Sequence, residues 1–158
     1  MFDRTTFLGV LARALGGAIA IAIIGLLHSR RIPPLGDPFC HVNCHSSPTA
    51  KPAQPRALIG GHLISTIVGL VMLKIFGPNP WAAAVAVGLS MMAMHLSSTF
   101  HPSAGIDPLV VVMNDMSWRF LFVPVGTGAV LLALFALIWH KLVAFGPNKP
   151  DKWPVRWW

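Results

Sequence analysis

Four apolar stretches dominate this 158-residue chain, at residues 7–27, 57–76, 81–96 and 120–143. An α-helix needs about 20 predominantly apolar residues to cross the hydrocarbon core of a bilayer. Hydrophobic residues make up 54% of the sequence and charged residues only 11%, whereas about a quarter of the residues in soluble domains are charged. The sequence therefore predicts an all-α polytopic membrane protein with about four transmembrane helices.

The apolar stretches fit one domain followed by a short tail. We assign residues 1–143 to a single transmembrane domain, in which residues 28–56 form a loop outside the membrane. Arg30 and Arg31 directly follow the first stretch, which favours a retained span over a cleaved signal peptide. The tail, residues 144–158, is basic and rich in Trp and Pro, and we expect it to lie unstructured at the membrane interface.

The net charge of +7 is carried mostly by side chains at the ends of the apolar stretches, a pattern typical of contact with lipid headgroups. A basic groove interleaved with aromatic residues is absent from the sequence, so we expect no nucleic-acid partner. Positive charge is slightly in excess on the side of the termini, which favours cytoplasmic termini in a bacterial inner membrane. The two predicted sides carry Arg4, Arg13, Lys74, Lys141, Lys149, Lys152 and Arg156 against Arg30, Arg31, Lys51, Arg56 and Arg119.

A polar, glycine-containing segment, Thr-Phe-His-Pro-Ser-Ala-Gly at residues 99–105, separates the third and fourth stretches. Irregular backbone at membrane depth is tolerated only where protein covers it or where it lines a wet cavity. The apolar residues 109–113 that follow are too few to span. They lie between prolines and an Asn-Asp pair, so we predict a re-entrant or interfacial half-helix.

This polar segment is our first candidate for an anion-binding site. Pro102 suits the first turn of a helix, and Ser103, Ala104 and Gly105 would let backbone N–H groups approach a ligand. The amino end of a half-helix favours anions, and His101 would add a donor. The alternative is a simple tight turn between a span and a surface helix.

Four further residues complete the predicted anion site. His62 lies inside the second stretch with Ser65 on the same helical face, and an ionisable residue at membrane depth is a functional candidate by default. The alternative for His62 is a neutral side chain bonded to a neighbouring helix. Arg56 and Arg119 would attract anions to the mouth of the path.

Small residues predict where helices approach closely. Gly61, Ser65 and Gly69 recur at intervals of four, which places them on one stripe of the second stretch. Gly88 in the third stretch and Gly126 in the fourth are the predicted counterparts.

The segment Cys40-His41-Val42-Asn43-Cys44-His45 suggests metal binding at first sight. Four ligands within six residues do not easily surround one tetrahedral zinc ion, so Cys40, His41, Cys44 and His45 form either a partial site or a free loop. We expect no cofactor. The chain has five Asp and no Glu, and no catalytic constellation is visible, so we expect no enzyme activity.

Several of these segments resemble the HPP family of integral membrane proteins. The resemblance rests on Gln54-Pro55-Arg56, on residues 60–65 (Gly-Gly-His-Leu-Ile-Ser) with Gly69, on residues 101–105, similar to that family's HPPAG signature, and on Val123-Pro124-Val125-Gly126. Ser103 replaces the second proline of the signature, and residues 34–47 replace a segment that is usually apolar. The resemblance implies about four transmembrane helices and, from members linked to nitrite transport, passage of a small anion.

These observations lead to one functional expectation and two alternatives. We expect an integral membrane protein that transports a small inorganic anion such as nitrite, and a homo-oligomer, since one such chain is small for a sealed pathway. One alternative is a non-transporting membrane module that binds a metal through the Cys/His loop. The other is an assembly subunit of a membrane complex.

Overall fold

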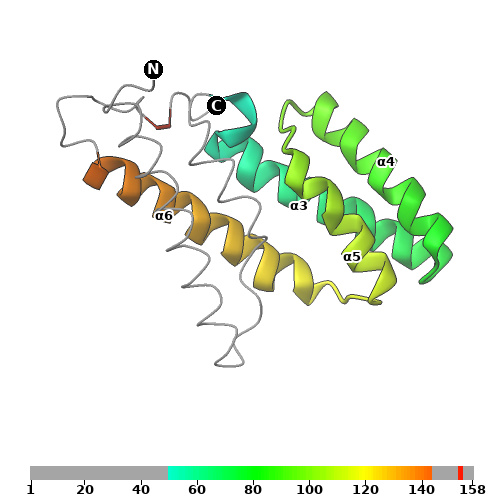
Figure 1. Cartoon of the computed structure of the whole chain (residues 1–158). Helices are drawn as coiled ribbons and strands as arrows, with labels where there is room; N and C mark the ends of the chain where they lie inside the picture. Colours follow the sequence, from blue (N-terminus) through cyan, green and yellow to red (C-terminus); the bar gives the residue numbers. More distant parts are fainter. Residues whose placement is uncertain (1–49, 144–152, 155–158) are drawn as a thin grey trace, which may run out of the picture.

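The computed structural model describes residues 50–143 and 153–154, and in these residues every regular element is helical (Figure 1). The expected all-α fold is therefore confirmed. The first apolar stretch, the Cys/His loop and the tail other than Trp153 and Pro154 lie outside the described residues.

The helices α3 (Pro55–Phe76) and α4 (Pro80–Leu96) form an antiparallel pair. Proline opens each helix, where its missing N–H costs no hydrogen bond. Gly77 ends α3 with a positive φ of 68°, and the side chain of Asn79 caps α4 by accepting from the Ala82 amide at 2.8 Å. Met72 of α3 packs against the alanines at the start of α4, which fixes the two helices side by side.

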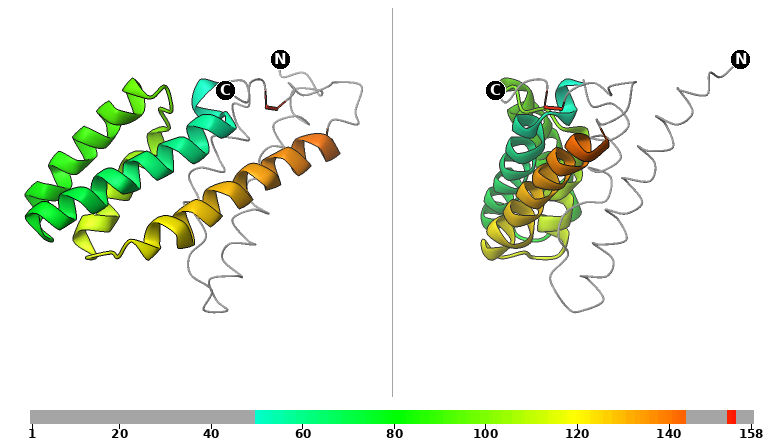
Figure 2. Two further views of the ribbon diagram at one scale, coloured as in Figure 1. Left: turned by 180° about the vertical axis from the view of Figure 1, so that it is seen from behind. Right: turned by 90° about the vertical axis from the view of Figure 1, so that its left-hand side faces the viewer.

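A short helical segment follows, made of the 3-10 helix η2 (Pro102–Ile106) and α5 (Asp107–Met113). It lies against α3 and runs in the same direction (Figures 1 and 2). His62 contacts Asp107, Gly69 approaches Pro108, and Met72 packs near Val112. The contacts therefore follow the same order along α3 and along the short segment. The expected half-helix thus begins beside the amino-terminal part of α3 and ends beside its carboxyl-terminal part.

The last long helical segment has two parts, the π-helical η3 (Leu121–Gly126) and α6 (Thr127–Val143). Pro124 lies inside η3, and the backbone of Val123 is extended, with φ −134° and ψ 109°. Proline has no N–H to donate to the preceding turn, which accounts for the break. Leu132, Ala133 and Ala136 then pack against Leu58, near the amino end of α3.

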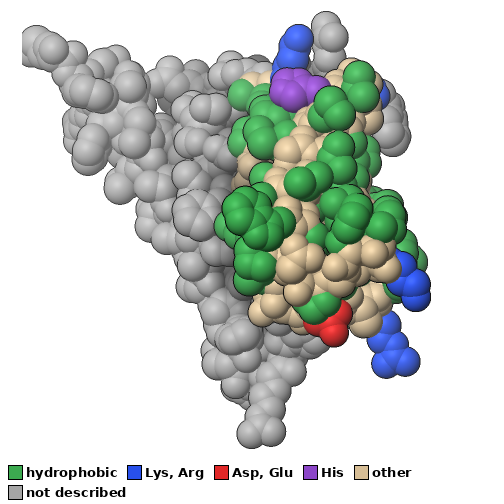
Figure 3. Space-filling model, turned by 90° about the vertical axis from the view of Figure 1, so that its right-hand side faces the viewer, with side chains coloured by type: hydrophobic (Ala, Val, Ile, Leu, Met, Phe, Trp, Pro, Cys, Tyr) green, Lys and Arg blue, Asp and Glu red, His purple; other side chains and the backbone are tan. Residues whose placement is uncertain are grey.

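Two helices of the described region are long and apolar enough to cross a membrane, Pro55–Phe76 and Leu121–Leu142. The helix α4, with 17 residues, and the segment Pro102–Met113 are shorter and also apolar. One side of α4 is apolar and exposed along its length, through Trp81, Val85, Leu89, Met92 and Leu96. In Figure 3, hydrophobic side chains are spread over one face of the molecule, with Lys or Arg side chains toward both of its ends. Such a surface suits contact with lipid.

The structure corrects the sides assigned to the charged residues. Because α3, α4, the Pro102–Met113 segment and α6 alternate in direction, the amino end of α3 and the carboxyl end of α6 lie at the same end of the bundle. Arg56 and Lys141 therefore share one end, and Lys74 and Arg119 share the other. The charge count from the sequence placed Arg56 and Lys141 on opposite sides of the membrane. It did so because it assumed that residues 96–119 begin and end on the same side.

Trp153 also departs from the expectation of an interfacial anchor. Its side chain is buried, its indole N–H donates to the carbonyl oxygen of Ala53 at 2.8 Å, and its ring stacks on His140 with centroids 5.8 Å apart. Indole buries readily when its N–H finds an acceptor. At this point the tail is part of the packed protein.

Candidate functional site

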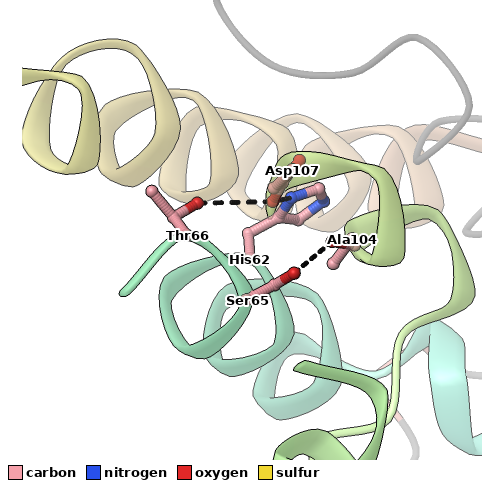
Figure 4. A network of polar contacts seen from close by, with 5 residues as sticks. All are labelled: His62, Ser65, Thr66, Ala104 and Asp107. Atoms are coloured by element: carbon pink, nitrogen blue, oxygen red, sulfur yellow. Dashed lines mark hydrogen bonds and ion pairs between the residues drawn. The ribbon is translucent and has the colours of Figure 1, made fainter. Parts of the chain in front are cut away.

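A cluster of polar side chains lies between α3 and the Pro102–Met113 segment, inside an otherwise apolar bundle (Figure 4). His62, Ser65 and Thr66 project from one face of α3 because residues three and four apart are neighbours on a helix. Ala104 and Asp107 face them from the short segment. The cluster therefore joins two elements that are about 40 residues apart in the sequence.

The closest charged contact in the cluster joins His62 and Asp107. The Nδ1 atom of His62 lies 2.7 Å from Oδ2 of Asp107, and both side chains are buried. Thr66 donates its hydroxyl to the same oxygen over a longer distance, 3.5 Å. A buried carboxylate is costly unless it is paired and hydrogen-bonded, and these contacts supply both conditions.

Ser65 and His101 hold the backbone around this pair. The Ser65 hydroxyl donates to the carbonyl oxygen of Ala104. The imidazole of His101 is fully buried, and its Nδ1–H donates to the carbonyl oxygen of Pro52 at 2.7 Å. The His101 ring centroid is 5.3 Å from that of His62. Burial disfavours the charged imidazole, so His101 acts here as a neutral donor.

Two glycines of α3 allow this close approach. A Cβ at Gly61 would lie 2.7 Å from the Cβ of His101 and 2.9 Å from the carbonyl oxygen of Thr99. A Cβ at Gly69 would lie 2.8 Å from the Cα of Pro108. Contacts below 3.0 Å require the neighbours to move, so only glycine lets the polar segment pack directly on the α3 backbone.

The other two glycines predicted to pack helices are placed differently. A Cβ at Gly126 would meet the carbonyl oxygen of Leu121 at 3.1 Å and a Leu63 methyl group at 3.9 Å. At Gly88 no atom of the described part of the chain lies within 4 Å of such a Cβ. A Cβ at Gly60 would also lie 2.8 Å from a Thr99 methyl group. In this region, close packing on α3 thus involves Gly60, Gly61 and Gly69, and a role for Gly88 stays a prediction.

The structure gathers only part of the predicted anion site. Ala104 is buried in the cluster, Ser103 and Gly105 are half-buried beside it, and Pro102 is exposed. Arg56 is exposed at the same end of the bundle, where its guanidinium donates to the carbonyl oxygen of Ser97 at 3.0 Å.

Two other parts of the prediction are not joined to this cluster. Arg119 is exposed and lies at the opposite end of the bundle. Cys40, His41, Cys44 and His45 lie outside the described residues. Within residues 50–143 and 153–154, no group of three or more His, Cys, Asp or Glu side chains could hold a metal ion.

Sequence reasoning missed Asp107 as the partner of His62. Two features of the sequence point to this partner. A histidine inside a span needs a compensating group, and Asp107 is the acidic residue closest to the polar segment, immediately before Pro108 at the start of an apolar helix. No sequence periodicity shows that this segment packs at the level of His62, because that depends on the close approach at Gly61 and Gly69.

Apolar helices, a lipid-compatible surface and an internal polar cluster define an integral membrane protein. Residues 3–149 match the transmembrane region of the HPP family. The chain belongs to that family, as its motifs indicated.

Two relatives in Dictyostelium discoideum are described as transmembrane proteins. One is 33% identical over 159 residues, which cover 91% of this chain, and the other is 36% identical over 119 residues, which cover 70% of it. The matched region amounts to 50% of the first relative and 40% of the second, so this chain spans half or less of each. No solved structure matches the chain.

Proposed function

We propose that this HPP family protein passes a small inorganic anion across the membrane, with nitrite as the first candidate. The observation that carries the proposal is the buried polar cluster of His62, Ser65, Thr66, His101 and Asp107 within an apolar bundle. Ionisable side chains buried within membrane segments are costly, and they mark substrate and ion pathways. Nitrite itself comes from the resemblance to HPP members linked to its transport.

In this proposal the cluster replaces part of the hydration of the anion. The donors are Nε2–H of a protonated His62 and backbone amides of Ser103 and Gly105. Nδ1–H of His101 and the hydroxyl of Ser65 join them by exchanging their carbonyl acceptors, Pro52 and Ala104, for the anion. Arg56 raises the anion concentration at one end of the bundle, and Arg119 does so at the other. We propose a homo-oligomer with a transport role rather than an enzymatic one. Location in a bacterial inner membrane and cytoplasmic termini stay predictions from the sequence.

The test is nitrite uptake into proteoliposomes by the full chain and by His101→Ala. Loss of one hydrogen bond to a charged group costs about 1.5–3 kcal/mol, so we expect uptake to fall about tenfold or more. The matched control is His95→Ala, because His95 is an exposed histidine of α4 whose ring stacks on Phe100 at 4.1 Å. Its uptake should stay at the wild-type level.

The outcome also separates the alternatives. Wild-type uptake equal to that of protein-free vesicles would contradict the transport proposal and favour an assembly subunit. A stoichiometric metal content after purification without an affinity tag, lost on replacing Cys40 and Cys44 by serine, would favour the metal-binding module.

A further inference from the structure

We propose that His62 and Asp107 form a proton-binding site which couples each anion to a proton, so that the two cross the membrane together. This inference rests on the proposed anion transport and adds the coupling ion. The ligand it assigns to the pair is a proton.

The geometry of the pair allows one proton to be gained and lost. Nδ1 of His62 and Oδ2 of Asp107 are 2.7 Å apart, a distance typical of a charge-assisted hydrogen bond. With the proton bound, the pair has no net charge, because the imidazolium offsets the carboxylate. After the proton leaves, a neutral imidazole faces a carboxylate and the pair has a net charge of −1.

This difference in charge decides whether an anion can enter. Charges interact far more strongly inside a protein than in water, so an unprotonated pair repels an anion that approaches Ser65 or His101. A protonated pair does not. Binding of the proton therefore favours binding of the anion, and by linkage the anion favours the proton to the same degree. A monovalent anion and a proton together add no net charge to the bundle.

Few other ionisable groups of the described region act on this pair. His101 is the nearest, with its ring centroid 5.3 Å from that of His62. His95 of α4 is exposed against Phe100, and His140 of α6 is stacked on Trp153. The remaining charged side chains on the packed elements lie toward the ends of the bundle: Lys51, Arg56, Lys74, Asp115, Arg119 and Lys141.

Two neighbouring side chains favour a proton-binding role for the His62–Asp107 pair over a purely structural role. Thr66 donates to Asp107 at 3.5 Å, a contact long enough to tighten when the carboxylate loses its imidazolium partner. His101 places a second imidazole beside the first, with ring centroids 5.3 Å apart. A proton leaving His62 thus has acceptors and donors of the usual kinds nearby.

The test measures what drives nitrite uptake by the wild-type protein in proteoliposomes. Coupled uptake should acidify the lumen, as read by an enclosed pH dye, and its initial rate should rise when the outside is more acidic. It should not respond to membrane potential. A potential of about 100 mV, inside negative, would oppose an uncoupled monovalent anion roughly 50-fold. Protein-free vesicles are subtracted at every condition, because nitrous acid crosses bilayers unaided.

The variant Asp107→Asn removes the carboxylate and keeps the shape of the side chain. We expect its nitrite uptake to lose both the lumen acidification and the response to pH, and any uptake left to follow the membrane potential. Asp115→Asn is the matched control, since Asp115 is exposed beyond the end of α5 and asparagine tolerates its positive φ of 49°. It should behave as the wild type.

The outcomes distinguish this inference from the proposed function. Wild-type uptake that follows membrane potential and moves no protons would overturn the coupling and leave anion transport in place. Uptake no greater than in protein-free vesicles would overturn both. Because the wild-type measurement decides between coupled and uncoupled transport, a variant that fails to fold does not remove the test.

Discussion

Replacing Asp107 by leucine is expected to lower the free energy of unfolding by about 3 kcal/mol, more than a hundredfold in the ratio of folded to unfolded protein. The reason is that His62 would stay buried without its partner, 2.7 Å away in the native protein. Removing one member of a buried ion pair costs about 3–5 kcal/mol. Equilibrium unfolding in mixed micelles, followed by helicity, measures the loss.

The double variant His62→Leu with Asp107→Leu provides the sharper control. Replacing both members of a buried ion pair by apolar residues is often neutral, whereas removing one is strongly destabilising. We therefore expect the double variant to regain most of the stability that each single variant loses. A double variant destabilised by the sum of the two single losses would show that the two side chains act independently, and would remove the basis for a shared proton.

Gly61→Ala is the second substitution with a large expected effect, a loss of about 2 kcal/mol in the free energy of unfolding. The new Cβ would lie 2.9 Å from the carbonyl oxygen of Thr99 and 2.7 Å from the Cβ of His101. Neither is the end of a flexible side chain, so the backbone that carries His101 must move away from α3. The same unfolding assay measures the effect, and nitrite uptake should fall with it.

Gly88→Ala is the matched control in the same protein. At Gly88 a Cβ meets no described atom within 4 Å, and the residue lies in the interior of α4. Alanine is favoured over glycine in a helix by about 0.5–1 kcal/mol, so we expect unchanged or slightly higher stability. A loss at Gly88 as large as that at Gly61 would mean that another part of the protein, or a second copy, packs on this face.

The helices were predictable from the sequence because their signals are local. Apolar length predicted the helices at 57–76 and 81–96, and the prolines at 102 and 108 predicted the half-helix. Pro55 and Pro80 mark the starts of α3 and α4, as expected from their fixed φ. The expected close approach at Gly61 and Gly69 agrees with the contacts of these glycines, since small residues leave room for a neighbouring backbone.

The direction of the short segment and the partner of His62 were not predictable in the same way. Both depend on how far residues 97–101 turn before Pro102, and no periodic pattern describes an irregular turn. The direction decides that Arg119 lies far from His101. It also places Asp107 beside His62. The sequence thus identified most donors of the cluster but not its carboxylate.

The most direct measurement is the reaction of Ser103→Cys with a small, charged, membrane-impermeant thiol reagent, in a protein with Cys40 and Cys44 replaced by serine. Ser103 is half-buried and directly precedes Ala104, whose carbonyl oxygen accepts from Ser65 of the polar cluster, so a permeating anion should reach and shield it. We expect this cysteine to react and nitrite to slow the reaction, while larger organic anions of the same charge leave its rate unchanged. A reaction rate that nitrite leaves unchanged would contradict the claim that an anion passes through this cluster.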